Sequence, residues 1–167
     1  MARDDGNIIL EGVQILPGNY RNFAGRPTPY NKDGGVRDFA VLLPDDLAEQ
    51  MFKDGLGVKH TRDREDDEGE VIHGVPFIKV KVNFDGFKPP QIFMSTSRNR
   101  THLGEGEVDI LDSADIVNAD MIIRPWETKI NGVVHHPLYL QSLYVDIEED
   151  YLAEKYARLD EERKMRD

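Results

Sequence analysis

The stretch VPFIKVKVNF, residues 75–84, decides the fold of this chain. Apolar and polar residues alternate along it with the period of two that is typical of a half-buried β-strand. The core face carries the apolar residues, Ile78, Val80, Val82 and Phe84, and the opposite face carries Phe77, Lys79, Lys81 and Asn83. The pattern therefore predicts a strand with a sealed inner face and a basic outer face that also presents an aromatic ring.

Similar alternation predicts further strands on both sides of this one, at residues 8–16, 36–43, 56–60, 91–96, 119–126 and 137–147. Pro44, two acidic residues and a Gly at position 55 delimit a short helix over residues 45–54. Asn131-Gly132 is a turn signal, and the charged block 61–70 is expected at a solvated hairpin tip. The chain is thus expected to be mostly β, a five- to six-stranded antiparallel barrel with one short helix.

The C-terminal end has a different character from the rest of the chain. Residues 150–165 are rich in Glu, Lys and Arg and predict a C-terminal helix. We therefore divide the chain into a β-domain, residues 1–148, and a charged helix or tail, residues 149–167.

Composition narrows the classes of protein that the chain can belong to. The 167 residues include no Cys, which removes disulfides, thiolate metal sites and cysteine nucleophiles. No long apolar run or signal-type segment is present, so we expect a cytoplasmic protein with no membrane partner. The formal net charge of −11 argues against uniform coating of duplex DNA, but it does not exclude a local basic groove.

Motifs for catalysis or for cofactor binding are missing from the sequence. The five His residues do not form a metal-binding motif, and no phosphate-binding Gly-rich loop occurs. Asp109, Asp112, Asp115 and Asp120 lie in a turn-rich region, where capping and solvation are the commoner roles. We therefore expect no enzymatic activity, no metal and no cofactor.

Two segments combine basic and aromatic residues despite the acidic total. Residues 71–102 hold five bases and one acid, and residues 20–39 hold four bases and two acids. Such segments suit unpaired nucleic acid, because rings stack on bases while cations meet phosphates. The candidate binding residues are Arg21, Phe23, Arg26, Tyr30 and Arg37 in the first segment, Phe77, Lys79, Lys81, Arg98 and Arg100 in the second, and the neighbouring pair Arg124 and Trp126.

A structural interpretation of the same residues stays open at this stage. Lys79 and Lys81 would then only make the sheet soluble, Phe77 would close a small apolar cluster, and Trp126 would belong to the core.

An ordered series of short motifs resembles one known family. The series runs from GVRDF (35–39) through the helix pattern PxxxAxxMxxxG and then FIKVKVNF, PPQIF and IRPWE to PLYLQSLYVDIEEDYLAEKYA. Over most of residues 7–157 it is similar to the small single-stranded DNA-binding proteins of tailed bacteriophages, which have an OB fold. The resemblance implies an OB-fold barrel that binds single-stranded DNA during phage replication or recombination in the host cytoplasm. It also implies that Arg37, Lys79 and Lys81 contact phosphates and that Phe23, Tyr30 and Phe77 stack on bases.

Partners and competing functions follow from these expectations. Single-stranded DNA is the expected ligand, replication or recombination proteins are expected to bind the acidic C-terminal region, and a homodimer is left open. One alternative is a phage structural or adaptor protein whose β-domain makes only protein contacts. Another is a metal-dependent nuclease that uses Asp109, Asp112 or Asp120.

Overall fold

The strand predicted from VPFIKVKVNF forms the wall of the barrel. It is β8 (Pro76–Lys81) in the computed structural model, which describes residues 2–4, 6–29, 32–86, 88–97, 99–148 and 163–164. Ile78 and Val80 are fully buried and Val82 is nearly so, whereas Lys79 and Lys81 are exposed. The predicted division of this strand into an apolar and a basic face is confirmed at these positions.

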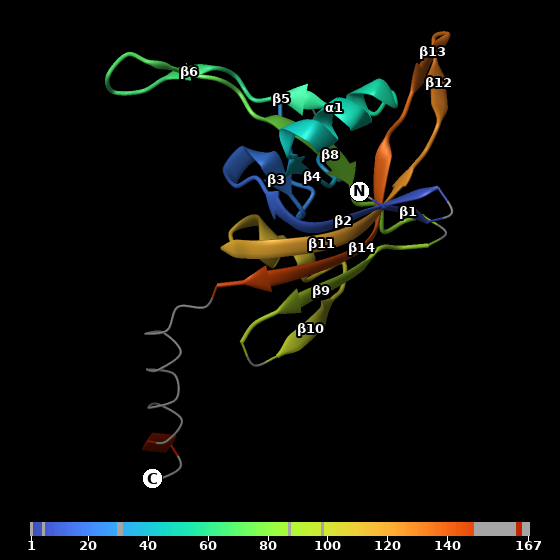
Figure 1. Cartoon of the computed structure of the whole chain (residues 1–167). Helices are drawn as coiled ribbons and strands as arrows, with labels where there is room; N and C mark the ends of the chain where they lie inside the picture. The colour runs from blue at the N-terminus through green and yellow to red at the C-terminus, as the bar shows by residue number, and fades with distance from the viewer. Residues whose placement is uncertain are drawn as a thin grey trace.

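Five strands close into a barrel around that apolar face. In chain order they are β2 (Asn7–Ile15), β4 (Asp38–Leu42), β8, β11 (Ile116–Pro125) and β14 (Leu138–Ile147). They pair in the order β2-β4-β8-β14-β11, and β11 pairs again with β2 (Figure 1). The predicted OB-like barrel is confirmed, with one difference: β14 runs parallel to β8, at the register pair Tyr139 and Lys81.

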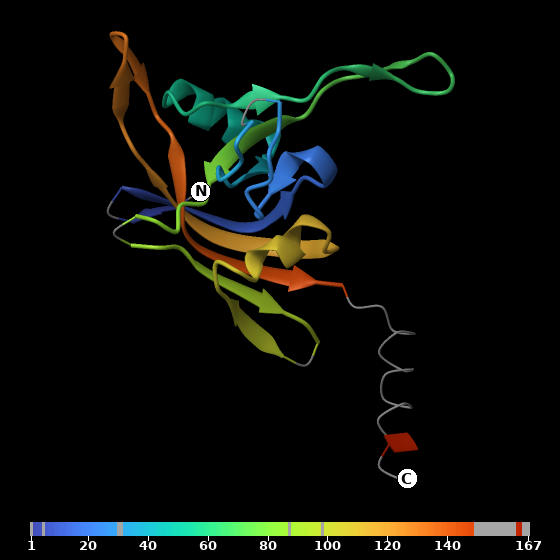
Figure 2. The ribbon, with the colours of Figure 1, turned by 180° about the vertical axis from the view of Figure 1, so that it is seen from behind.

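Further strands extend the barrel or project from it. β9 (Gln91–Ser95) pairs in parallel with β14 and forms a hairpin with β10 (Arg100–Leu103). The hairpin of β6 (Arg64–Glu65) and β7 (Val71–Ile72) and that of β12 (Thr128–Ile130) and β13 (Val133–His135) leave the barrel in different directions (Figures 1 and 2). The remaining short elements are β1 (Ala2–Asp4), β3 (Arg21–Asn22), β5 (Lys59–His60) and the 3-10 helices η1 (Gly18–Tyr20) and η2 (Val108–Asp112).

The predicted helix and turns are also found. α1 (Asp45–Lys53) follows Pro44, begins with two acidic residues, and buries Ala48 and Met51 in the barrel core. Asn131 and Gly132 both have positive φ angles, 51° and 82°, as a tight turn between β12 and β13 requires. The acidic block forms the exposed tip of the β6–β7 hairpin, as expected.

The predicted C-terminal helix lies almost entirely outside the described residues, of which only 163–164 fall in it. In the part of the chain that is described, no helix has the length and apolar character needed to cross a membrane.

Arg21 holds the long loop after β2 against the barrel. Its side chain is buried, with 5% of the residue exposed, and its guanidinium donates hydrogen bonds to four backbone carbonyl oxygens. The acceptors are those of Ile15, Leu16, Leu111 and Ala114, at 2.6–3.2 Å. Burial lowers the pKa of Arg21 from its usual value, an effect that the nearby Asp112 and Asp115 oppose. The prediction that Arg21 contacts DNA is therefore wrong, because its donors are committed to the fold.

Replacing Arg21 should destabilise the protein strongly. Arg21→Ala removes the donor from two buried and two partly buried carbonyl groups, and we expect a loss of about 3 kcal/mol in the free energy of unfolding. Urea denaturation followed by circular dichroism measures this loss. Arg26→Ala is the matched control, since the Arg26 side chain is 60% exposed and its loss should cost less than about 1 kcal/mol. Equal stability of the two variants would contradict this role of Arg21.

Candidate nucleic-acid interface

The closure of the barrel brings basic and aromatic side chains from three strands into one row. Lys81 of β8 is the register partner of Tyr139 of β14, and Tyr139 in turn pairs with Arg124 of β11. The Lys81 ammonium lies 6.0 Å from the centre of the Tyr139 ring, within the range of a cation–π contact. Three segments far apart in the sequence thus build a single surface.

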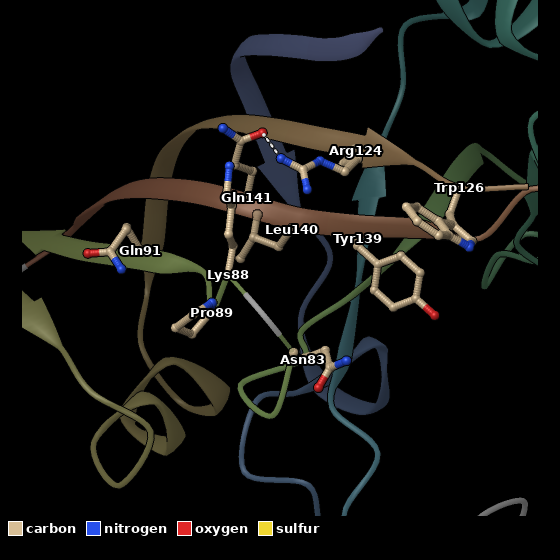
Figure 3. Close-up of a pocket in the computed structure, with 10 residues that line it drawn as sticks. Asn83, Lys88, Pro89, Gln91, Arg124, Trp126, Tyr139, Leu140 and Gln141 are labelled. Atoms are coloured by element: carbon tan, nitrogen blue, oxygen red, sulfur yellow. Dashed lines mark hydrogen bonds between the residues drawn. The ribbon is translucent and has the colours of Figure 1, made fainter. Parts of the chain in front are cut away.

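A groove of about 810 Å³ lies beside this row (Figure 3). It is lined by Asn83, Gly86, Lys88, Pro89, Gln91, Arg124, Trp126, Tyr139, Leu140 and Gln141. The Trp126 and Tyr139 rings lie at the same end of the groove in Figure 3, and Trp126 is 58% exposed. We call this site the β8–β14 groove. Its open space, the exposed Trp126 ring and the partly exposed Tyr139 ring can accept a flat ligand, and its two lining cations, with Lys81 beside them, favour an anionic one.

Hydrogen bonds orient the Arg124 side chain toward the groove. The guanidinium of Arg124 donates to Oε1 of Gln141 at 3.5 Å, and Asn7 donates to the same oxygen at 2.9 Å. Asn7 comes from β2, so three strands take part in this network. Because Arg124 uses one donor group here, its remaining donors stay available for a ligand.

Two of the predicted stacking residues are buried. Phe23 is fully buried and stacks on Phe39, with ring centres 4.9 Å apart. Phe77 is 6% exposed because Tyr20 of η1 covers its ring edge-on at 5.5 Å. The parity of β8 does place Phe77 away from the core, but the long loop after β2 covers that position. The prediction that these two rings are presented to bases is therefore wrong for this structure.

The basic residues of the first segment are partly engaged within the protein. Arg37 donates a hydrogen bond to the Phe23 carbonyl oxygen at 2.6 Å and lies 3.6 Å from a carboxylate oxygen of Glu105. Arg26 is mostly exposed and lies 3.8 Å from Asp112. Arg37 therefore serves the loop structure, whereas the Arg26 side chain remains accessible.

The other predicted residues lie in different places. Lys79 is exposed on the same face of β8 as Lys81, and Arg100 is exposed on β10, outside the β8–β14 groove. Tyr30 and Arg98 lie outside the described residues. Lys81, Arg124 and Trp126 are thus the predicted residues that the structure brings together.

Tyr139 and Gln141 also line the groove, and neither was predicted as a binding residue. Both alternate with the buried Leu138 and Leu140, so their outward direction was readable from the sequence. Their proximity to Lys81 was not readable, because it depends on the pairing of β14 with β8. Lys88, one of the five bases of residues 71–102, lines the groove but is not among the predicted binding residues.

Two of the three carboxylates named for metal chemistry, Asp112 and Asp120, have structural roles. Asp112 accepts hydrogen bonds from the backbone N–H groups of Phe23 and Ala24, and Asp120 accepts one from Gly12. Within the described ranges, no group of three or more His, Asp or Glu side chains is arranged to hold a metal ion.

Comparisons with known proteins extend the description of the fold. The single-stranded DNA-binding protein from bacteriophage Enc34 matches with a TM-score of 0.50 at 15% identity, over 87% of this chain and 83% of that chain. The same protein in complex with single-stranded DNA gives a TM-score of 0.48 at 14% identity, over 87% and 88% of the two chains. At 15% identity, the match with a TM-score of 0.50 shows a shared fold only. No curated protein matches the chain.

A family model provides the assignment that structural similarity alone does not. The model of the phage ssDNA-binding domain matches residues 2–165, which is nearly the whole chain. Taken with the barrel and its row of basic and aromatic side chains, this match shows that the chain belongs to the phage ssDNA-binding domain family.

Proposed function

We propose that the chain binds and protects single-stranded DNA in the β8–β14 groove, without catalysis, during phage DNA replication or recombination. The observation that carries the proposal is the convergence of Lys81, Tyr139, Arg124 and Trp126 beside one open groove. OB folds use the face of their second and third strands and the loop between their fourth and fifth strands for oligonucleotides. Here β8 is the third barrel strand, and Trp126 begins the connection between the last two.

The side chains of the groove divide between two kinds of contact. Trp126 and Tyr139 offer rings on which unpaired bases can stack, and each stacked base is worth about 1–3 kcal/mol whatever its identity. Lys81, Lys88 and Arg124 supply positive charge for the phosphates between those bases. Such a site binds single strands in preference to duplexes, because bases in a duplex are already stacked.

The acidic parts of the chain do not prevent binding in this groove. The net charge is −11, and six of the 32 acidic residues lie in the charged block 61–70 of the β6–β7 hairpin, which extends away from the barrel (Figures 1 and 2). Repulsion between exposed charges is screened over about 10 Å at 0.1 M salt. The charges of that hairpin are therefore screened from a phosphate bound beside Lys81, Lys88 and Arg124.

The roles of the carboxylates support binding without catalysis. A nuclease would need free carboxylates grouped around a metal, whereas Asp112 and Asp120 accept hydrogen bonds from backbone N–H groups that hold loops. Binding of replication or recombination proteins to the acidic C-terminal region stays a prediction, because nearly all of that region lies outside the described residues.

The first test of the proposal removes one charge beside the groove. Lys81→Ala should weaken binding to oligo-dT and to mixed-sequence strands by similar factors, because a phosphate contact carries no base information. It should also reduce the slope of log affinity against log salt by about 0.7, the contribution of one phosphate contact on a single strand. Fluorescence anisotropy of a labelled oligonucleotide at several salt concentrations measures both effects.

Arg64→Ala is the matched control for this charge removal. It changes the net charge by the same amount, but Arg64 is exposed on the β6 strand of the projecting hairpin. We expect the affinity and the salt slope of this variant to stay close to those of the parent protein. Equal effects of the two variants would mean that net charge, and not a contact at Lys81, governs binding.

The second test removes a ring. Tyr139→Ala should raise the dissociation constant for oligo-dT roughly 5- to 150-fold, which corresponds to the loss of one stacked base. The salt slope should remain unchanged because no phosphate contact is lost. Tyr139→Phe keeps the ring and should bind nearly as well as the parent. If Tyr139→Ala binds as tightly as the parent, the groove does not hold the DNA.

A further inference from the structure

A second group of aromatic side chains lies on the outer face of the sheet, outside the β8–β14 groove. Phe93 of β9 stacks on His102 of β10 at 4.9 Å and on Tyr144 of β14 at 5.0 Å, with interplanar angles of 27° and 10°. The three rings therefore form a continuous stack that runs across three neighbouring strands. We call it the Phe93 ring stack.

The Phe93 ring stack is accessible to a ligand. Tyr144 is 41% exposed, His102 is exposed, and Phe93 between them is half-buried. The Arg100 guanidinium lies 5.7 Å from the centre of the Tyr144 ring, and its Nε donates to Oγ of Ser95 at 3.3 Å. An accessible ring with a cation beside it resembles the combination of the partly exposed Tyr139 and Lys81.

An irregularity in β14 places the two tyrosines on the same side of the sheet. Tyr139 and Tyr144 are five residues apart, and an odd separation puts side chains on opposite faces of a regular strand. The pairing of β14 with β11 shifts register at Gln141, since Ile123 pairs with Leu140 and Ile122 with Ser142. Leu140 and Leu143 consequently both face the core, and Tyr139 and Tyr144 both face outward.

The Phe93 ring stack also continues directly from the groove. Gln91 lines the groove, and Phe93 follows it by two residues on the same face of β9. At about 3.3 Å per residue, Tyr139 and Tyr144 lie roughly 16 Å apart along β14. A single strand with bases stacked at about 3.4 Å would cover this distance with about five nucleotides, and a stretched strand with fewer.

We propose that the Phe93 ring stack is a second base-stacking site for the same DNA strand, so that the strand leaves the β8–β14 groove and follows β14 to Tyr144. This inference rests on the proposed function and extends its binding path. The acidic residues Asp120 and Asp146 also lie on β11 and β14 near Tyr144. Because they disfavour phosphates, the second site contributes stacking with at most one phosphate contact, at Arg100.

Binding of DNA strands of two lengths tests for the second site. An oligo-dT of about 3 nucleotides is too short to reach from Tyr139 to Tyr144, whereas one of about 16 nucleotides, the upper range for an OB fold, can reach both sites. Tyr144→Ala in the full chain should weaken binding of the long strand roughly 5- to 150-fold and change binding of the short strand less than about twofold. Tyr144→Phe, which keeps the ring, should bind both lengths as the parent does.

Each outcome of this test has one interpretation. Equal effects of Tyr144→Ala on the binding of both lengths, or no effect on either, would overturn the second site. The second site would also be overturned if the only effect of Tyr144→Ala were a changed sedimentation of the DNA-free protein. If the parent protein binds neither length, the proposed function itself fails. Tyr139→Ala separates the proposed groove from the proposed second site, since it should weaken binding of both the short and the long strand. Should Tyr144→Ala lower the melting temperature, His102→Ala at the exposed end of the stack replaces it, with the same expected dependence on length.

Discussion

The parallel pairing of β14 with β8 is the contact on which the rest of the structure depends. It closes the barrel, and it does so at the register pair Tyr139 and Lys81, so that one contact completes the core and assembles the surface. Without it, Lys81 would lie on one edge of an open sheet and the row of Tyr139 and Arg124 on the other. The binding surface that we propose is therefore a consequence of barrel closure, and it exists only in the folded chain.

Local features of the fold were readable from the sequence, and the reasons are physical. The period of two identified β2, β8, β11 and β14 because each buries one face, and the signals around Pro44 and at Asn131-Gly132 depend only on neighbouring residues. What covers an outward side chain is not a local property. Phe77 has the parity of an exposed residue, but Tyr20 covers it. Arg21 is a basic residue in a basic segment, but its guanidinium donates to four backbone carbonyl oxygens of the fold. Tyr139 was not predicted as a binding residue for the same reason, since its place beside Lys81 depends on the non-local pairing of β14 with β8.

Our proposal requires that an acidic protein present a basic surface to DNA. Charge is segregated: acidic residues dominate the β6–β7 hairpin, whereas Lys81, Lys88 and Arg124 surround the β8–β14 groove. The register shift at Gln141 then keeps the aromatic face of β14 continuous from Tyr139 to Tyr144. A regular strand would have turned one of these rings into the core, so a single irregularity determines how far the outer aromatic surface extends.

The central claim is that unpaired bases enter the β8–β14 groove, and Trp126 gives the most direct measurement of it. Trp126 is the only tryptophan of the chain, it is 58% exposed, and it lines the groove, so its fluorescence reports on this site alone. We expect titration with unlabelled oligo-dT to quench this fluorescence to saturation, with an affinity that falls as salt is raised. Binding seen by anisotropy with no change in Trp126 fluorescence would contradict the account, because the DNA would then be bound elsewhere on the protein.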